Sequence, residues 1–95
     1  PMDAPVQKHA EWLIRMVDLR RDHFTEVLRE LSHKDLTQLS TIVRCVLMMG
    51  MAELDRGELE ADVILDDILN LTRTYDGSES VGFVNGVLDA YMERQ

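Results

Sequence analysis

The stretch VGFVNGVLDAYME, residues 81–93, decides the fold that we expect of this chain. Its apolar residues recur at a spacing of three to four, which is typical of a helix that buries one face. Gly82, Gly86 and Ala90 fall four residues apart and so form a strip with almost no side chain. A glycine inside a helix costs about 1 kcal/mol relative to alanine, so two of them predict a compensating contact. We expect a neighbouring helix to cross this strip closely; the alternative is access of a ligand or an RNA backbone to the bare strip.

The rest of the chain has the pattern of further helices. Both of its prolines lie within the first five residues, which leaves long stretches without a helix breaker. The first apolar pattern predicts either one long helix or two helices in line. Together the patterns predict an all-α fold, a small helical bundle of four to five helices in a single domain that spans residues 1–95. The three further helices are expected at residues 5–31, 35–54 and 59–74.

Polar residues mark where these helices begin, and apolar residues mark the faces that they bury. Asp35 and Gln38 have the spacing of a capping box at the start of the second helix. Residues 42–51 are apolar on almost every side, which predicts a central buried helix with Cys45 as a small core residue. Ser78 or Ser80 is placed to cap the last helix. In the helix expected at residues 59–74, six apolar side chains are expected to face the core: Val63, Ile64, Leu65, Ile68, Leu69 and Leu71.

Charge and composition exclude several classes of function. The chain has 95 residues with 18 acidic and 10 basic side chains, a net charge of −8, so it repels a phosphate backbone. RNA binding by this chain alone is therefore not expected. A single cysteine allows neither an internal disulfide nor a zinc cluster. No apolar run approaches the roughly 20 residues that cross a bilayer, so we expect a cytoplasmic protein without a membrane span.

The sequence contains no constellation for catalysis, for a metal ion or for a cofactor. Asp66 and Asp67 are adjacent carboxylates, but neighbouring helical residues diverge by about 100°, so both cannot enter one site. The three histidines are far apart in the sequence, and none lies near Cys45. A glycine-rich phosphate loop is missing as well. We therefore expect a protein that is not an enzyme and has no catalytic residue, metal site or cofactor.

Residues 80–89, SVGFVNGVLD, resemble the C-terminal signature of the NusB transcription antitermination family. In that signature a serine and two variable positions precede FVNGVLD, which this chain matches at residues 83–89. Residues 42–54 are similar to the buried helix of the family, which typically ends in Glu-Leu. The resemblance covers about residues 10–92 and implies a NusB-like fold. It takes in the C-terminal part of a complete member, so the chain is expected to be a C-terminal fragment or a shortened relative.

The last helix contains a candidate structural motif and a candidate contact site. The motif consists of Asn85, Gly86 and Asp89. Because asparagine is a weak helix former, we expect its side chain to bind an adjacent loop or helix end; the alternative is a contact with a partner. A helix N-terminus has free N–H groups that can meet a phosphate, so the start of the last helix is the expected place for such a contact. The candidate contact residues for RNA or a protein partner are Ser78, Ser80 and Phe83.

By resemblance, the chain functions in transcription antitermination or termination control, as a protein-binding scaffold in a ribonucleoprotein complex. The partners in the family are a small-subunit ribosomal protein and boxA-type RNA. Family members begin with further helices that carry an arginine-rich motif, which has no counterpart here, and Met48 and Gly82 stand where arginine and lysine are common. The alternative function is a stand-alone helical oligomerisation or adaptor module that has lost RNA binding. A homodimer is its simplest form, because a second copy covers apolar surface that the absent helices leave bare.

Overall fold

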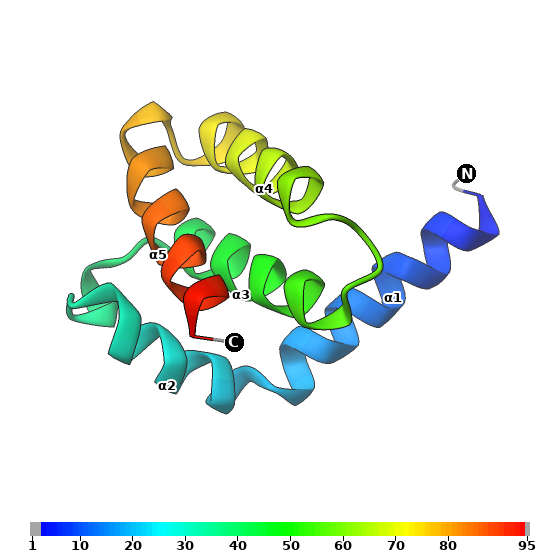
Figure 1. The fold of residues 1–95 in the computed structure, drawn as a ribbon, viewed down its shortest axis with the longest axis horizontal. Helices are drawn as coiled ribbons and strands as arrows, with labels where there is room; N and C mark the ends of the chain where they lie inside the picture. Colours follow the sequence, from blue (N-terminus) through cyan, green and yellow to red (C-terminus); the bar gives the residue numbers. More distant parts are fainter. Residues whose placement is uncertain (1–2, 95) are drawn as a thin grey trace.

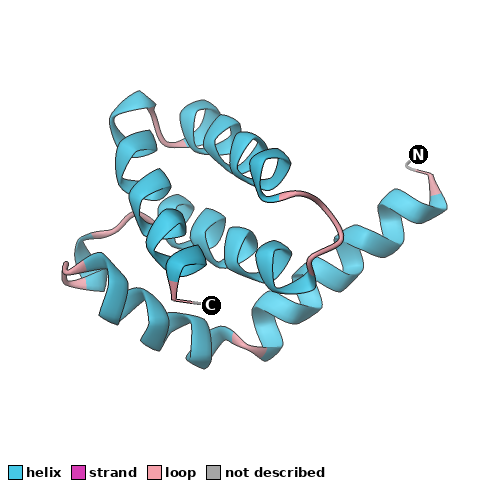
Figure 2. Cartoon of the chain, viewed as in Figure 1, coloured by secondary structure: helices cyan, strands magenta, loops and turns pink. Residues whose placement is uncertain are grey.

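The computed structural model describes residues 3–94, and all regular secondary structure in that range is helical. The predicted all-α fold is thereby confirmed. Two short 3-10 helices, η1 (Leu36–Gln38) and η2 (Ser78–Ser80), lie in the connections before the third and the fifth α-helix. Figure 2 shows that the loops between helices are short. The α-helices are α1 (Ala4–Leu19), α2 (Arg21–Ser32), α3 (Thr41–Arg56), α4 (Ala61–Tyr75) and α5 (Val81–Glu93).

The central helix of the bundle is α3. It packs against each of the other four α-helices, with α4 above it and α1 and α2 below it in Figure 1. Its Leu47 and Met51 side chains are fully buried, as the apolar run at residues 42–51 predicts. By contrast α1 is peripheral, since its N-terminal part projects beyond the bundle and none of its residues is buried.

A bend at Arg20 separates α1 from α2, and there the backbone φ and ψ are −105° and 18°. The Arg20 guanidinium lies 4.9 Å from the centre of the Phe24 ring. Its Nη1 donates a hydrogen bond to Asp55 Oδ2 at 2.7 Å, which fastens the bend to the C-terminal end of α3. The expectation of two helices in line is wrong, because α2 turns to cover α3 and α5 (Figure 1).

The start of α3 lies later in the chain than the capping-box spacing predicts. Asp35 accepts a hydrogen bond from the Thr37 N–H at 3.0 Å and so caps η1. Ser40 occupies the N-cap position of α3, where its Oγ accepts the Val43 N–H at 3.0 Å. The capping box of Asp35 and Gln38 is therefore wrong, because a turn of 3-10 helix separates Asp35 from the α-helix.

The hydrophobic core lies between α2, α3, α4 and α5 and is mostly aliphatic, with Phe24 and Tyr91 as its buried rings. Five of the six residues that we expect to face inward from α4 are buried or half-buried. Val63 is the exception, with 45% of its surface exposed. It lies three and four residues before Asp66 and Asp67, both exposed, and so shares their solvent-facing side of the helix.

Cys45 is exposed, so the prediction of a small core residue is wrong. It shares one face of α3 with Ile42 and Met49, at spacings of three and four residues. Ile42 is 37% exposed and Met49 is half-buried, because α1 covers only part of this face. The uncovered part of α3 lines an open groove beside α1.

The strip of small residues on α5 faces solvent, and the prediction that a neighbouring helix crosses it is wrong. Gly82 and Gly86 are exposed, and a Cβ added to either would meet no atom within 4 Å. Ala90 is half-buried. The packing contacts of α5 come from the other side of the helix, so the strip is left outside. The buried residues of α5 are Val84, Val87, Leu88 and Tyr91.

A close approach between helices does occur, but at Gly50 of α3. A Cβ added to Gly50 would lie 3.0 Å from Leu88 Cδ1 of α5 and 3.5 Å from Ile68 Cγ1 of α4. Glycine at this position therefore lets α4 and α5 pack closely on the central helix. The close helix crossing therefore takes place at a glycine of α3, whereas the sequence pattern predicts it at the small residues of α5.

Candidate RNA and protein interface

The connection between α4 and α5 brings the three candidate contact residues to one corner of the molecule (Figure 1). Ser78 and Ser80 lie in η2, and Phe83 lies in the first turn of α5. Gly77 begins the turn with a φ of 122°, a conformation that favours glycine. The candidate residues therefore share one short segment at which the chain reverses its direction.

Asp76 holds this corner together. Its carboxylate accepts hydrogen bonds from Ser80 Oγ and, at 2.7 Å, from Ser40 Oγ. Both bonds lower the pKa of Asp76 below its usual value of 3.8, and the bond from Ser80 has the larger effect. Because Ser40 also caps α3, the carboxylate joins the start of α3 to the start of α5.

The predicted capping of α5 by Ser78 or Ser80 is wrong, since no side-chain cap forms there. The Ser80 hydroxyl is engaged with Asp76. The segment η2 runs directly into α5, and the N–H groups of Ser80 and Val81 donate to the carbonyls of Gly77 and Ser78. Backbone oxygens thus satisfy donors that a cap would otherwise serve. Two of the N–H groups expected to meet a phosphate are already occupied.

Phe83 is half-buried beside Lys34, whose Nζ lies 4.5 Å from the centre of the ring. This is the geometry of a cation–π contact. Lys34 comes from the connection after α2, so no spacing in the sequence identifies it as a neighbour of Phe83. The corner combines this cation with the carboxylates of Asp76 and Glu79, and its charge is mixed rather than basic.

The structural motif of α5 lies on the solvent side of the helix. Asn85 is half-buried, and Gly86 and Asp89 are exposed. Asn85 Nδ2 donates to Asp89 Oδ2 at 3.4 Å within the same helix, so the expectation that Asn85 binds an adjacent loop or helix end is wrong. The core uses the other side of α5. The motif therefore forms a polar surface beside backbone that no side chain covers.

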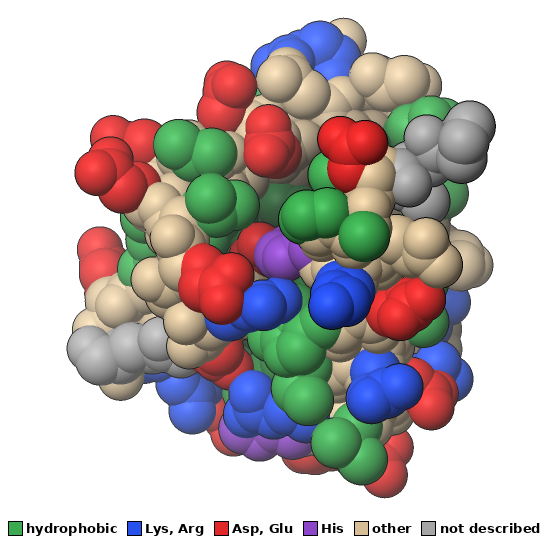
Figure 3. All heavy atoms as spheres, turned by 90° about the vertical axis from the view of Figure 1, so that its right-hand side faces the viewer, with side chains coloured by type: hydrophobic (Ala, Val, Ile, Leu, Met, Phe, Trp, Pro, Cys, Tyr) green, Lys and Arg blue, Asp and Glu red, His purple; other side chains and the backbone are tan. Residues whose placement is uncertain are grey.

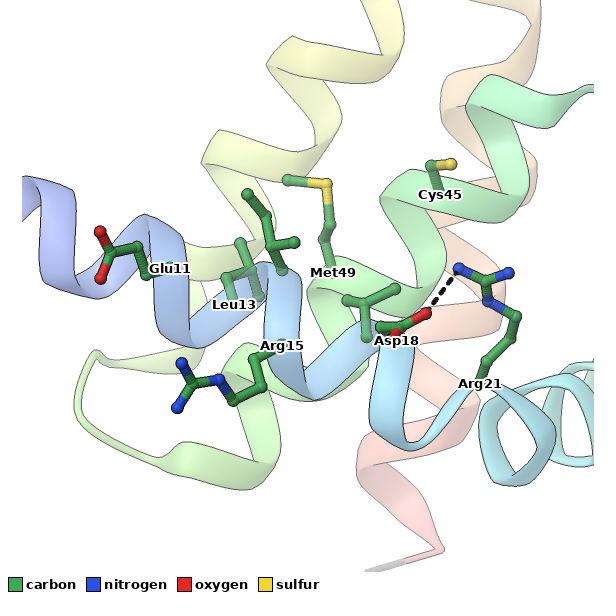
Figure 4. A pocket seen from close by; sticks show the side chains of 9 residues that line it. Glu11, Leu13, Arg15, Asp18, Arg21, Cys45 and Met49 are labelled. Carbon is green, nitrogen blue, oxygen red and sulfur yellow. Dashed lines mark hydrogen bonds and ion pairs between the residues drawn. The ribbon is translucent and has the colours of Figure 1, made fainter.

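A second open feature, which the sequence analysis misses, is a groove of about 650 Å³ between α1 and α3, here termed the α1–α3 groove (Figure 4). Ile14 of α1 is 70% exposed beside it, and Cys45 and Met49 contribute from α3. Apolar residues in the first helical pattern are a signal for it, but the pattern does not show which of them another helix covers. The lining residues are Glu11, Leu13, Ile14, Arg15, Val17, Asp18, Arg21, Cys45 and Met49.

Polar contacts fasten α1 to the end of α3. His9 Nε2 lies 2.6 Å from Glu53 Oε1, and Arg56 Nη1 lies 3.1 Å from His9 Nδ1. Because Arg56 donates to Nδ1, it is Nε2 that carries the proton and donates to Glu53. The Arg56 guanidinium also lies 4.1 Å from the centre of a Trp12 ring. This cluster fixes the position of α1, and with it the position of the α1–α3 groove.

The described surface is better suited to contacts with a protein than to electrostatic binding of phosphates. On the face in Figure 3, acidic side chains predominate in the upper half, and in the lower half basic side chains lie among acidic and apolar ones. Between residues 3 and 94, no three histidine, cysteine or carboxylate side chains are grouped so that they could hold a metal ion. None of the helices in that range combines the length and the apolar character needed to cross a membrane.

Comparison with known proteins agrees with the resemblance of the last helix. A model of the NusB family matches residues 1–93. The transcription antitermination protein NusB of Solibacter usitatus is 37% identical over 82 residues, which cover 79% of this chain and 56% of the relative. The proteins of the same name from Leptospira biflexa and Myxococcus xanthus are 27% and 33% identical over 89 residues, which cover 92% of this chain and 64% of each relative.

The chain thus spans 56% to 64% of the length of these curated relatives. No solved structure matches it significantly. The match to the family model does not depend on how Gly82 and Gly86 pack, so the corrected position of that strip leaves the assignment intact. Because the family model covers nearly the whole sequence, the chain belongs to the NusB family.

Proposed function

We propose that this chain acts in transcription antitermination as a protein-binding scaffold of a ribonucleoprotein complex, in the cytoplasm and without catalysing a reaction. The observation that carries the proposal is the solvent side of α5, where the family signature places Asn85, Gly86 and Asp89. Core packing requires none of these three, whereas Val84 and Leu88 of the same signature are fully buried. A rigid helix that is anchored through one side and polar on the other is suited to hold a partner.

The partner that we propose for this side of α5 is a small-subunit ribosomal protein. A protein that binds ribosomal RNA carries positive charge, and this chain has a net charge of −8, so long-range attraction favours their association. At short range Asp89 supplies a carboxylate, and the bare backbone at Gly82 and Gly86 lets a partner approach the helix closely. The proposed mechanism is therefore binding alone.

We propose that boxA-type RNA binds jointly with that ribosomal protein, through the corner formed by Ser78, Ser80 and Phe83. Phe83 offers a ring on which a base can stack, and Lys34 supplies a cation beside it. The net charge of −8 repels phosphate, so we expect the chain alone to have low affinity for RNA. The ribosomal protein would supply the positive charge that the chain lacks.

Calorimetric titration of the chain with the ribosomal protein, and then with boxA-type RNA, tests the proposal. We expect the ribosomal protein to bind, and the RNA to bind the protein pair tightly and the chain alone weakly. Asp89→Lys should weaken binding of the ribosomal protein by about tenfold or more, because it sets a cation against a basic partner. The matched control, Asp67→Lys, makes the same change of charge at an exposed position of α4. Equal weakening by both variants, or no binding at all, contradicts the proposal.

The α1–α3 groove favours a second candidate function, a stand-alone oligomerisation or adaptor module that does not bind RNA. Exposed apolar surface of this kind marks a site of interaction. The two candidates respond differently to salt, since RNA binding through phosphates weakens steeply with added salt and the burial of apolar surface does not. Titration with RNA at two salt concentrations therefore separates them.

A further inference from the structure

Burial changes sharply at the bend between α1 and α2. None of the residues of α1 is buried, whereas each of the other four α-helices has at least three buried residues. Phe24, one turn after the bend at Arg20, is fully buried. A segment is held in place largely by the apolar surface that it buries, so α1 is the α-helix with the least to hold it.

The apolar contact of α1 is with one face of α3. Trp12 and Met16 of α1 line a small cavity together with Ala52 of α3, which is 2% exposed. Three other helices, α2, α4 and α5, also pack on α3 (Figure 1). Within the described chain the buried residues of the core begin at Phe24, after the end of α1. The core can therefore stay folded when α1 leaves α3.

Polar contacts add to this limited apolar contact. Within residues 3–94, the polar side-chain contacts between α1 and α3 involve His9, Trp12, Glu53 and Arg56, here termed the His9 cluster. Glu53 is only 8% exposed, and His9 donates to its carboxylate at 2.6 Å. A nearly buried carboxylate that loses its donor is costly, so the His9 cluster favours α1 in its docked position.

The bend at Arg20 is a point about which α1 can turn. The backbone there departs from helical geometry, with φ at −105° and ψ at 18°. The Arg20 side chain is fixed separately, by its bond of 2.7 Å to Asp55 and its contact with the buried Phe24 ring. These contacts belong to the bend itself, so they can persist when α1 moves away from α3.

We propose that α1 undocks from α3 and docks again as one unit, turning at Arg20, while α2 to α5 stay folded. The His9 cluster holds the docked form. Isolated helices shorter than roughly 12 to 15 residues are marginal in water, and α1 has 16, so it gains little helical stability from its own length once it is undocked. Undocking thus exposes the backbone amides of α1 and the face of α3 around Ala52. The inference is independent of both candidate functions.

Hydrogen exchange resolved by residue tests the proposal on the unchanged chain. We expect the amides in the middle of α1 to share one free energy of opening and to exchange about a hundredfold faster than those of α3. A small domain that opens only by global unfolding would protect both helices equally, and that result overturns the proposal. A steady gradient of exchange along α1 also overturns it, because the helix would then fray from its end and not undock.

A pair of alanine variants tests the role of the His9 cluster. His9→Ala should make the middle of α1 exchange about tenfold faster, because Glu53 loses its donor, and should leave exchange in α4 unchanged. The matched control is Lys8→Ala, at an exposed neighbouring position where the lysine forms no ion pair among residues 3–94. This control should leave exchange in α1 unchanged.

Fluorescence gives a second readout, because the chain has one tryptophan, Trp12, and it lies in α1. His9→Ala should lower the denaturant concentration at which the fluorescence changes, and should leave the main loss of circular dichroism where it is in the unchanged chain. Equal effects of His9→Ala and Lys8→Ala overturn the role of the His9 cluster. If His9→Ala speeds exchange in α4 as much as in α1, the two do not open separately, and the proposal is overturned.

Discussion

Asp76 lies between the first turn of α3 and the turn that leads into α5, where Ser80 and Ser40 donate to its carboxylate. These bonds favour the ionised form and so place the pKa of Asp76 in the folded chain below its usual value of 3.8. A carboxyl group with a lowered pKa stabilises the fold at pH values above its unfolded pKa. That stabilisation is lost as the pH falls through the folded pKa, because the folded chain must then bind a proton on a group that donors surround.

Asp76→Asn should therefore lower the melting temperature at neutral pH, and the difference from the unchanged chain should shrink as the pH falls below about 4. The amide of asparagine has one acceptor oxygen, so it cannot accept from both serines as the carboxylate does. Thermal melts between neutral pH and about pH 2 measure the difference. Asp67→Asn, at an exposed position of α4, is the control. If the difference in melting temperature is as large in acid as at neutral pH, the effect comes from the shape of the side chain and not from its ionisation.

At the scale of helices, α3 and α5 each contain a glycine in the interior, and the two should respond in opposite ways to substitution. Gly86→Ala should stabilise the chain by about 1 kcal/mol, since alanine favours the helix and the new Cβ meets no atom within 4 Å. Gly50→Leu should destabilise it by about 1 to 3 kcal/mol or more, since a Cβ there already lies 3.0 Å from Leu88. Denaturant unfolding measures both. The control is Gly86→Leu, which adds a side chain of the same size as Gly50→Leu does. If Gly86→Leu fails to fold, the outer side of α5 is not free.

The residues at which these helices begin and end can be predicted from the sequence more directly than the helices that pack against them. The expected helices at 59–74 and 81–93 correspond to α4 and α5, because apolar periodicity is a property of one helix by itself. Which face another helix covers depends on the whole bundle, and periodicity says nothing of that. The small residues of α5 fit a close crossing as well as an open surface, and the apolar neighbours of Cys45 fit a core as well as a half-covered groove.

Only the part of the candidate contact corner that is local in the sequence could be predicted. Ser78, Ser80 and Phe83 lie within one short segment, so a local signature brings them together. Lys34 and Ser40 reach the same corner from connections on either side of η1, through the folding of α2 and α3 against α5. Contacts of that kind are a product of the tertiary fold and leave no trace in the spacing of residues.

At the scale of the whole molecule, the net charge of −8 acts on an approaching partner before any contact forms. The rate of association with a basic ribosomal protein should therefore fall about tenfold between low salt and roughly 0.5 M salt, with little change in the rate of dissociation. Stopped-flow mixing at a series of salt concentrations measures both rates. An association rate that does not depend on salt would show that the acidic field of the chain plays no part in binding.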